Sequence, residues 1–287
     1  MIAVDWGTSS FRAFWMDGCT IRDRVEDTRG ILAVEGRFAK TLRDAVAPWL
    51  TAGETRILVS GMAGSRQGWV EAPYVPCPAG AAELAGALTP VPFEGASVLL
   101  LPGVSAQDAQ GVPEVMRGEE VQVVGELHRI EGTVCLPGSH SKWAQVSEGR
   151  IAGFATHLTG EAFAALRGHT ILGRLMADRP HDPAAFAKGV ARSGEAGGLL
   201  HHLFGVRALG LMGRLPDAGA ASYLSGLLIG HEVRAAAPGG AVHLIGAAAL
   251  CARYAEAIAL CGGGATVAVP DAAARGLATV GALASWS

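Results

Sequence analysis

The sequence has few charged and few aromatic residues for its length. Charged residues make up 17% and aromatic residues 6% of its 287 residues, and the formal net charge is −3. The 23 lysines and arginines form no basic stripe, so a nucleic-acid partner is not predicted. No apolar run approaches the length of a bilayer span, so no membrane-crossing segment is expected either. These absences favour a globular protein with neither a nucleic-acid nor a membrane partner.

The five cysteines are scattered and include no Cys-x-x-Cys pair. Neither a zinc site nor a disulfide framework is therefore predicted, and reduced thiols in a cytoplasm fit this pattern better. Asp5 interrupts the first apolar run, and no basic segment precedes that run. The N-terminus consequently lacks the features of a secretory signal peptide, and we expect a cytoplasmic protein.

The sequence is rich in small and apolar residues. Hydrophobic residues make up 50% of the chain, and there are 40 glycines. This composition allows a sizeable core with tight turns and close helix packing, and the length predicts one large domain or two ordinary ones. Apolar runs of strand character alternate with segments of helical period, which predicts two α/β halves. Four helices are expected in the second half, near residues 160–176, 183–190, 195–213 and 220–236.

An internal similarity links two distant segments. "VDWGTSSFRAFWMDG" at residues 4–18 and "CLPGSHSKWAQVSEG" at residues 135–149 align without a gap. Each is predicted to form a strand, a turn of glycine and hydroxyl residues, a second strand and an acidic-glycine turn. Backbone amides and hydroxyls at such a turn form a cradle for anions. Two such turns facing each other across a cleft would hold a polyphosphate from both sides.

Several motifs resemble those of a known superfamily. "DWGTSSFR" is similar to the phosphate-1 motif of sugar kinases with the actin/hexokinase-type ATPase fold, and "LPGSHSKW" is similar to their phosphate-2 motif. "SGMAGSRQGWVEAPYVPCPA", "VMRGEEVQ" and "THLTGEAFAALRGHTILG" extend the resemblance to the 2-dehydro-3-deoxygalactonokinase family over nearly the whole chain. The resemblance implies a two-lobed actin-like, duplicated ribonuclease H-like α/β fold with an interlobe cleft. It places the N-terminal lobe at residues 1–117 and the C-terminal lobe at residues 118–287.

The resemblance also implies the cofactors, ATP and Mg²⁺, and the residues that hold them. Asp5 would hold Mg²⁺, a hard cation that prefers oxygen ligands. The residues expected at the ATP phosphates are Gly7, Thr8, Ser9, Ser10 and Arg12 in the first motif, and Gly138, Ser139, His140, Ser141 and Lys142 in the second. Gly246 lies where the superfamily contacts adenosine. The sequence departs from the usual Gly-Gly pair at that point, because Ala247 follows Gly246.

The resemblance places the catalytic acid directly after Gly118, which selects Glu119. Helical spacing puts Glu120 at the head of an apolar stripe with Val123 and Val124, and Glu119 at the head of a polar one. A carboxylate that heads a buried stripe also invites a catalytic role, so Glu120 remains an alternative. The pair could equally do no more than compensate the dipole of a helix N-terminus.

In related kinases the first half supplies most sugar contacts, so the block "GMAGSRQGW" is the candidate substrate loop. Arg66, Gln67 and Trp69 are the predicted substrate residues, with a structural glycine-rich loop as the alternative. Thr159 is expected to be an N-cap of the following helix.

The function implied by the resemblance is ATP-dependent phosphorylation of 2-dehydro-3-deoxy-D-galactonate at its 6-hydroxyl. A kinase for another sugar or sugar acid, and an actin-like ATP-binding switch, are the alternatives. A small-molecule sugar acid is the expected partner, and a homodimer is compatible with the sequence.

Overall fold

The computed structural model describes residues 1–268 and 270–286 of the chain. They fold into two compact units. The first unit comprises residues 1–131, 144–155 and 270–286, and the second comprises residues 132–143 and 156–268. The compact units do not follow the predicted lobes residue for residue, because the segment after residue 117 packs with the first unit. The functional division at residue 118 stays a prediction.

The first unit contains a mixed sheet built around β1. Its strand order is β3-β2-β1-β4-β7-β6. Strand β1 pairs antiparallel with β2 and parallel with β4. The strands are β1 (Ile2–Trp6), β2 (Phe11–Asp17), β3 (Thr20–Asp27), β4 (Arg56–Gly61), β6 (Thr89–Val91) and β7 (Ser97–Leu100).

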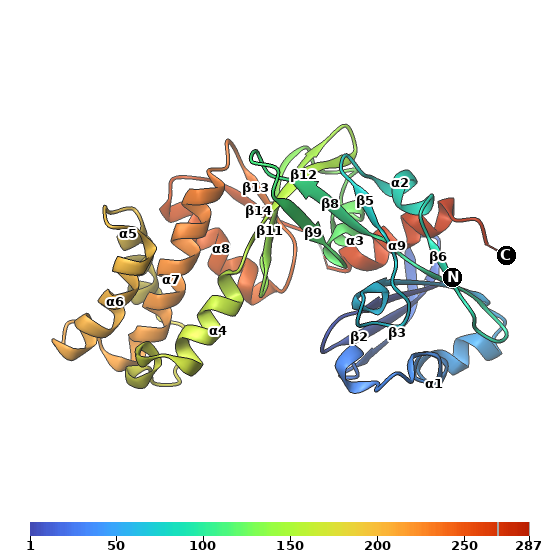
Figure 1. The fold of residues 1–287 in the computed structure, drawn as a ribbon, viewed down its shortest axis with the longest axis horizontal. Coiled ribbons are helices and arrows are strands. Elements are labelled where there is room, and N and C mark those ends of the chain that lie inside the picture. The colour runs from blue at the N-terminus through green and yellow to red at the C-terminus, as the bar shows by residue number, and fades with distance from the viewer. Residues whose placement is uncertain (269, 287) are drawn as a thin grey trace. The chain divides into compact units, whose positions relative to one another are not determined.

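Strand β1 is buried along its whole length because helices cover both faces of this sheet. Ile2, Val4 and Trp6 share a hydrophobic core with α1 (Phe38–Thr51). On the other face, α9 (Ala272–Leu283) packs closely, and a Cβ atom on Gly281 would lie 3.7 Å from Leu58. The apolar run that begins the sequence is therefore an inner strand of the sheet. Figure 1 labels α1 and α9, the two helices that cover it.

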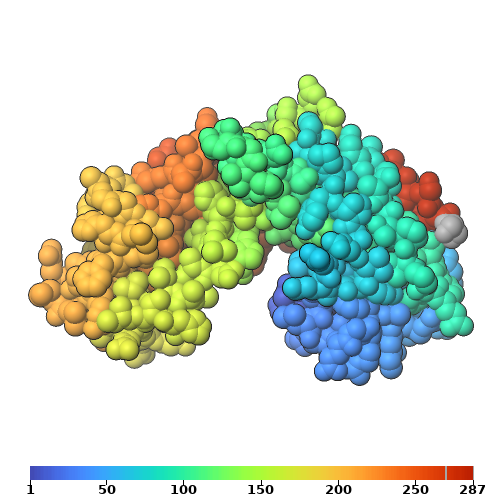
Figure 2. Space-filling model, in the orientation of Figure 1, coloured from blue at the N-terminus to red at the C-terminus, as the bar shows by residue number. Residues whose placement is uncertain are grey.

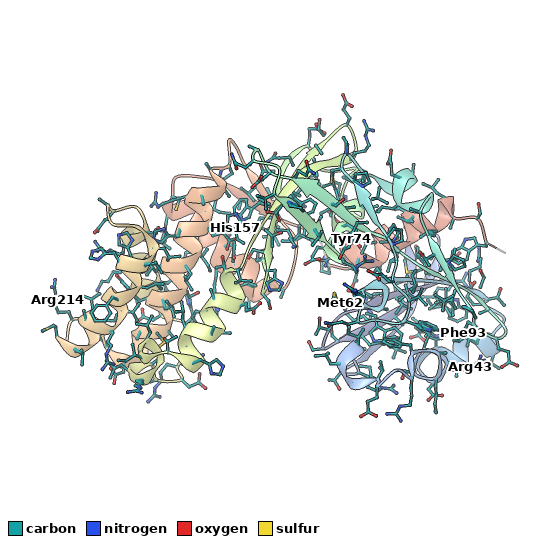
Figure 3. The ribbon with its side chains drawn as sticks, in the orientation of Figure 1. Arg43, Met62, Tyr74, Phe93, His157 and Arg214 are labelled. Carbon is teal, nitrogen blue, oxygen red and sulfur yellow. The ribbon has the colours of Figure 1, made fainter. Side chains whose placement is uncertain are left out.

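The first unit also contains a small sheet of order β5-β8-β9. In this unit the guanidinium of Arg43 lies 4.6 Å from the ring centroid of Phe93, and Figure 3 labels both side chains. The remaining elements are η1 (Ile31–Ala33), η2 (Met62–Gly64), β5 (Tyr74–Pro76), α2 (Ala81–Ala85), β8 (Gly103–Gln107), β9 (Pro113–Met116) and α3 (Glu119–Val124).

The second sheet repeats the plan of the first. Its order is β12-β11-β10-β13-β14, and β10 pairs parallel with β13. As in the first sheet, three sequential strands lie side by side and the next strand of the sheet is parallel to the first of them. The internal similarity predicted from the sequence is confirmed by this arrangement. The strands are β10 (Gly132–Leu136), β11 (Ser141–Ser147), β12 (Arg150–His157), β13 (Val242–Leu244) and β14 (Ala265–Val267).

Helices make up most of the second unit. In Figure 2 the gold atoms belong to α5 and α6, at the edge of this unit. Small residues allow α5 and α7 to approach closely: a Cβ atom on Gly226 would lie 2.1 Å from the carbonyl oxygen of Phe186. The helices are α4 (Thr159–His169), η3 (Ile171–Leu175), α5 (Pro183–Ser193), α6 (Gly198–Leu211), α7 (Asp217–Ala236) and α8 (Ala248–Leu260).

The four helices predicted for the second half are present, with two corrections. The first is shorter than predicted, because α4 ends at His169 and a separate 3₁₀ turn follows. The predicted N-cap is also wrong: Leu158 occupies that position, and Thr159 is the first residue of α4. No helix in the described residues is long and apolar enough to cross a membrane.

Candidate active site

Asp5 lies near the C-terminal end of β1 and is buried, with 8% of its surface exposed. It pairs with Arg12, the residue opposite it on β2. Burial raises the pKa of Asp5, and the charge and hydrogen bond of Arg12 only partly oppose this effect. One half-exposed arginine therefore does not fully compensate the buried carboxylate, and a second cation beside it would stabilise its charged form. The structure joins Arg12 to Asp5 rather than leaving it free for a phosphate.

The predicted phosphate-1 residues form the turn between β1 and β2. The N–H of Gly7 donates to the carbonyl of Ser10 at 2.9 Å, and Ile31 donates to the carbonyl of Gly7 at 3.0 Å. Thr8, Ser9 and Ser10 are exposed. The turn is thus fixed by its backbone while its hydroxyls face outward, which suits a role as donors to an anion.

Helix α3 begins beside the end of β4. Gly61, at the end of β4, pairs with Trp6 of β1. Gly118 has a φ of 104°, and a Cβ atom on it would lie 3.2 Å from the Cα of Gly61. This close glycine contact brings the start of α3 to the sheet edge that carries Asp5. The start of α3, predicted from the sequence to belong to the C-terminal lobe, thus lies in the same compact unit as Asp5.

The two glutamates have different surroundings. Glu120 is fully buried, and one carboxyl oxygen accepts a 2.6 Å hydrogen bond from the N–H of Gly118. Its other oxygen is buried without a hydrogen-bond partner among the described residues. Burial, with the charge of Glu119 as the next cause, raises the pKa of Glu120 to about 8. Glu120 is therefore a protonated carboxylic acid near neutral pH, whereas Glu119 is partly exposed.

The predicted polar stripe behind Glu119 is interrupted. Helix α3 ends at Val124, and Glu126 beyond it is 1% exposed and paired with Arg275 of α9. Gly125 is the C-cap, and α9 passes so close to it that a Cβ atom there would lie 2.0 Å from the carbonyl of Ala272. The short helix serves mainly to present its first turn.

The predicted substrate loop follows β4 and η2. Arg66 and Gln67 are exposed, and Arg66 makes no hydrogen bond or ion pair with the described residues. Trp69 instead packs on the core of the first unit, stacked on Phe38 with ring centroids 6.1 Å apart. The loop thus offers one free arginine beside a tryptophan that is anchored in the core.

Arg117 ties this loop to the start of α3, a contact that sequence reasoning missed. Its guanidinium donates to the carbonyls of Ala72 at 2.8 Å and Pro73 at 3.3 Å, and lies 4.3 Å from the ring centroid of Tyr74. Tyr74 is labelled in Figure 3. Gly64 leaves space for this side chain, because a Cβ atom there would lie 3.0 Å from Nη1 of Arg117.

In the second unit, the predicted phosphate-2 turn lies against the N-terminus of α4. A Cβ atom on Gly160 would lie 2.4 Å from the carbonyl of Gly138, and the N–H of Glu161 donates to the carbonyl of Ser139 at 3.0 Å. His140 is exposed and pairs with Glu161. The positive end of the dipole of an 11-residue helix thus lies beside the turn, which favours an anion there.

Ser141 and Lys142 are placed differently from the rest of that motif. Ser141 is fully buried, and its hydroxyl lies 2.7 Å from that of Tyr254 on α8. Lys142 is 6% exposed and donates to the hydroxyl of Thr156 at 2.9 Å. Both side chains of the motif therefore point into the second unit, while Gly138, Ser139 and His140 form its outer turn.

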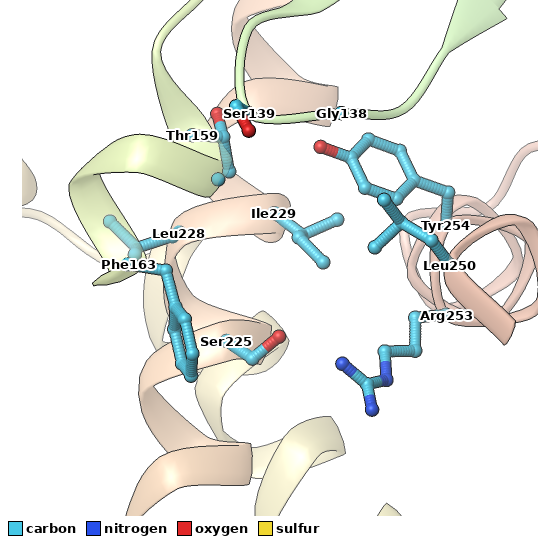
Figure 4. Close-up of a pocket in the computed structure, with 11 residues that line it drawn as sticks. Gly138, Ser139, Thr159, Phe163, Ser225, Leu228, Ile229, Leu250, Arg253 and Tyr254 are labelled. Carbon is cyan, nitrogen blue, oxygen red and sulfur yellow. The ribbon is translucent and has the colours of Figure 1, made fainter. Parts of the chain in front are cut away.

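A cavity of about 260 Å³ opens beside this turn, close to the lower end of the range for small-molecule sites. Its walls are largely apolar, and Figure 4 shows the guanidinium of Arg253 and the hydroxyl of Ser225 pointing into it. The lining residues are Gly138, Ser139, Thr159, Gly160, Phe163, Ser225, Leu228, Ile229, Leu250, Arg253 and Tyr254.

Sequence reasoning found the rim of this cavity but missed its walls. The walls come from three helices far apart in the sequence, so no local motif marks them. Gly246, the predicted adenosine contact, is not among the lining residues; it lies between β13 and α8, where a Cβ atom would be 3.6 Å from the carbonyl of Pro137.

The carboxylate of Asp5 fits one mode of magnesium binding. The described residues contain no cluster of three or more histidine, cysteine, aspartate or glutamate side chains that could hold a metal. Mg²⁺ at phosphate-transfer sites is held by one or two carboxylates, with water and substrate phosphates completing its shell. A single buried carboxylate whose charge is incompletely compensated matches that mode.

The duplicated sheets, each with a glycine-hydroxyl turn after its first strand, give the chain the actin-like ATPase fold. Two solved structures of low identity share this fold with TM-scores of 0.51: a Porphyromonas gingivalis protein named as an N-acetylglucosamine kinase, and a Clostridium difficile activator of 2-hydroxyisocaproyl-CoA dehydratase with bound ADPNP. The kinase is 12% identical, and the match covers 98% of this chain and 98% of the kinase. The activator is 10% identical, and the match covers 98% of this chain and 93% of the activator.

The chain belongs to the 2-keto-3-deoxy-galactonokinase family, whose model matches residues 5–280. It is therefore an ATP-dependent kinase. A Rhizobium meliloti (strain 1021) protein named as a probable 2-dehydro-3-deoxygalactonokinase is 37% identical over 99% of this chain and 97% of its own length. The Escherichia coli (strain K12) 2-dehydro-3-deoxygalactonokinase is 32% identical over 95% and 94%. A Sinorhizobium meliloti crystal structure named for the same enzyme has a TM-score of 0.88 at 36% identity, covering 98% and 95%.

Proposed function

We propose that this chain transfers the γ-phosphoryl group of ATP to the 6-hydroxyl of 2-dehydro-3-deoxy-D-galactonate. Family membership across nearly the whole chain supports this reaction. The observation in the structure that carries the proposal is the arrangement in the second unit, where a glycine-hydroxyl turn, a helix N-terminus and an apolar cavity adjoin. A nucleoside triphosphate has a matching order of parts: a flat apolar base and a chain of anionic phosphates.

In this proposal the cavity holds the nucleoside, and the turn of Gly138, Ser139 and His140 binds phosphate oxygens. Phe163, Leu228 and Leu250 provide apolar walls for the base, while Arg253 and Ser225 provide polar groups. The turn of Gly7, Thr8, Ser9 and Ser10 supplies a second set of amides and hydroxyls for phosphates. The pairing of His140 with Glu161 leaves the backbone amides of the turn as its main donors.

Asp5 would hold Mg²⁺, in the single-carboxylate mode described above. Bound there, the ion would neutralise phosphate charge and align the γ-phosphoryl group. In this proposal Arg12 helps to keep Asp5 ionised, because the charge of Arg12 opposes the rise in the pKa of Asp5 that burial causes. This residue orients the carboxylate whether or not it also reaches a phosphate.

Glu119 acts as the base in this proposal. The 6-hydroxyl oxygen forms a bond to the γ-phosphorus, the bond from that phosphorus to ADP breaks, and the hydroxyl proton passes to the Glu119 carboxylate. Glu120, protonated near neutral pH, cannot accept that proton but supports the turn through its bond with Gly118. Arg66 is the group proposed to pair with the sugar-acid carboxylate, since its planar fork is unoccupied and matches that geometry.

Steady-state ATP turnover tests the proposal. ADP release should be slow with ATP and Mg²⁺ alone and should rise strongly when 2-dehydro-3-deoxy-D-galactonate is added. The gluconate-derived epimer is the matched control, because it differs only in one hydroxyl configuration. Preference for the epimer would indicate another sugar acid. Slow turnover that no sugar acid changes would contradict a kinase and favour an ATP-binding switch. A homodimer and a cytoplasmic location remain predictions.

A further inference from the structure

A buried hydrogen-bond network joins the phosphate-2 motif to two helices. Glu232 of α7 is 3% exposed, and the two side chains that donate hydrogen bonds to it are neutral. Its Oε1 accepts from the indole N–H of Trp143 at 2.7 Å, and its Oε2 accepts from the hydroxyl of Tyr254 at 2.7 Å. The hydroxyl of Tyr254 also lies 2.7 Å from that of Ser141.

The network has a direction that follows from counting protons. The indole N–H of Trp143 can only donate, and the hydroxyl of Tyr254 donates to Oε2 of Glu232. Tyr254 has a single hydroxyl proton, and that proton forms the hydrogen bond to Glu232. Ser141 must therefore donate to the oxygen of Tyr254. Burial and the charge of Glu232 raise the pKa of Tyr254, which keeps this proton on the tyrosine.

This direction gives the buried carboxylate an effect beyond its own contacts. Tyr254 lines the cavity together with Gly138 and Ser139, and Ser141 begins β11 directly after the outer turn. Trp143 lies two residues further along the same strand. Glu232 thus fixes β11 at two points, and one of them runs through a wall of the cavity (Figure 4).

We propose that Glu232 is a positioning residue that acts through Tyr254 and Ser141 to hold the turn of Gly138, Ser139 and His140 in its phosphate-binding conformation. Glu232 touches neither the cavity nor the turn, so it is not a catalytic residue. A buried carboxylate with two neutral donors is costly unless both bonds are kept, which makes the network rigid. The inference rests on the proposed nucleotide role of this cavity.

Amide hydrogen exchange of the ligand-free protein tests the positioning without depending on any nucleotide. Tyr254→Phe keeps the ring and removes the hydroxyl, and should speed exchange at residues 138–142. Ile258→Val is the matched control: Ile258 is fully buried in the same core cluster but lies outside the network. It should lower the melting temperature without changing exchange in the turn. If both variants changed exchange in the turn equally, the network would contribute only to the overall stability of the fold. That result would overturn the proposal.

Calorimetric titration with ATP and Mg²⁺ tests the consequence. Loss of one buried hydrogen bond predicts that Tyr254→Phe binds ATP about 3- to 10-fold more weakly, whereas Ile258→Val stays within about 2-fold of the parent. Glu232→Gln keeps an acceptor for Trp143 but presents a donor to Tyr254, so the direction of the remaining bonds must reverse. It should give an intermediate loss.

Two results would contradict the proposal: unchanged exchange and affinity in Tyr254→Phe, or parent values in Glu232→Gln. Faster exchange of the turn in Tyr254→Phe combined with no ATP binding by the parent would have a different meaning. It would support the positioning role and reject the nucleotide role of the cavity.

Discussion

Glu119 and Glu120 are adjacent in the chain, yet the structure places their carboxyl groups in different surroundings. Glu120 is fully buried, its pKa is raised to about 8, and the N–H of Gly118 holds one of its oxygens. Glu119 is partly exposed at the same helix start. A base must be ionised at the working pH, and a carboxylic acid with a pKa above that pH is not. The sequence left open which of the two glutamates is the base, and the burial of Glu120 favours Glu119.

Glutamine substitutions separate the two. Glu119→Gln should lower kcat by roughly 10²-fold or more, the range for a positioned acid–base group, with little change in KM for ATP. Glu120→Gln should retain most activity, because an amide has nearly the shape of the protonated acid that it replaces. Steady-state kinetics at neutral pH would measure both. An inactive Glu120→Gln variant beside an active Glu119→Gln variant would reverse the assignment.

The turn in the second predicted phosphate motif was predictable from the sequence, but the direction of the side chains that follow it was not. The pattern "GSHSK" predicted a row of donors at a phosphate, and the turn of Gly138, Ser139 and His140 is exposed or partly exposed as that requires. Ser141 and Lys142 point inward to Tyr254 and Thr156. Those two partners come from other elements, and no local pattern in the motif specifies them.

At the scale of elements, Arg117 couples the substrate loop to the helix that carries the glutamates. It holds two loop carbonyls and stacks on Tyr74, and it precedes Gly118 in the chain. Its Nε and Nη1 are buried without hydrogen-bond partners among the described residues, so the bonds of Nη2 fix its position. A lysine cannot bond both carbonyls in one plane and stack at the same time.

Arg117→Lys should therefore raise KM for the sugar acid by roughly tenfold, while the affinity for ATP stays the same. Because the whole loop loosens, a neutral analogue lacking the carboxylate should suffer equally. Arg66→Lys should raise KM for the acid but spare the neutral analogue, since only the charge pair is lost. Arg24→Lys, which alters another arginine stacked on an aromatic ring in the same unit, is the control. Equal effects of Arg66→Lys on acid and analogue would remove Arg66 as the carboxylate-binding residue.

Elements with a strong local pattern were predicted well, and those set by distant packing were not. The two hairpin-like segments follow from their turns and apolar runs. Helix α5 begins at the predicted residue 183 because Asp182 caps it and Pro183 follows. The close approach of α9 to Gly125 joins distant segments, and the cavity wall comes from three separate helices. Contacts between segments so far apart leave no periodic signal in the sequence.

At the scale of the whole molecule, the duplicated plan puts polar chemistry at the same place in each sheet. The turn after β1 and the turn after β10 both follow a buried strand, and both carry glycine and hydroxyl residues. The cost of this plan is that acidic groups are buried at the first of these edges. Asp5 and Glu120 both have raised pKa values because burial disfavours their charged forms. The stability of the fold should therefore depend on pH through these carboxyl groups.

The sign of that dependence follows from proton binding. Unfolded Glu120 releases its proton near its ordinary pKa of 4.5, whereas the folded residue keeps it until about pH 8. Between these values the folded state binds more protons, so the free energy of unfolding should fall as pH rises, by about 1.4 kcal/mol per pH unit for one proton. The raised pKa of Asp5 adds a contribution of the same sign.

Urea denaturation at several pH values in that window would measure the effect. Glu120→Gln should remove one proton's share of the slope, because its amide does not titrate, while the share of Asp5 remains. The charge of Glu119 is the second cause of the raised pKa of Glu120. Glu119→Gln should therefore lower the pKa of folded Glu120 and so lower the pH at which the pH dependence of stability ends. The free energy of unfolding should thus depend on pH more steeply in the parent than in Glu120→Gln, and this difference should be largest between about pH 5 and pH 8. Parallel stability curves for the two proteins would mean that Glu120 is ionised in the folded state, and Glu120 would then return as a candidate base.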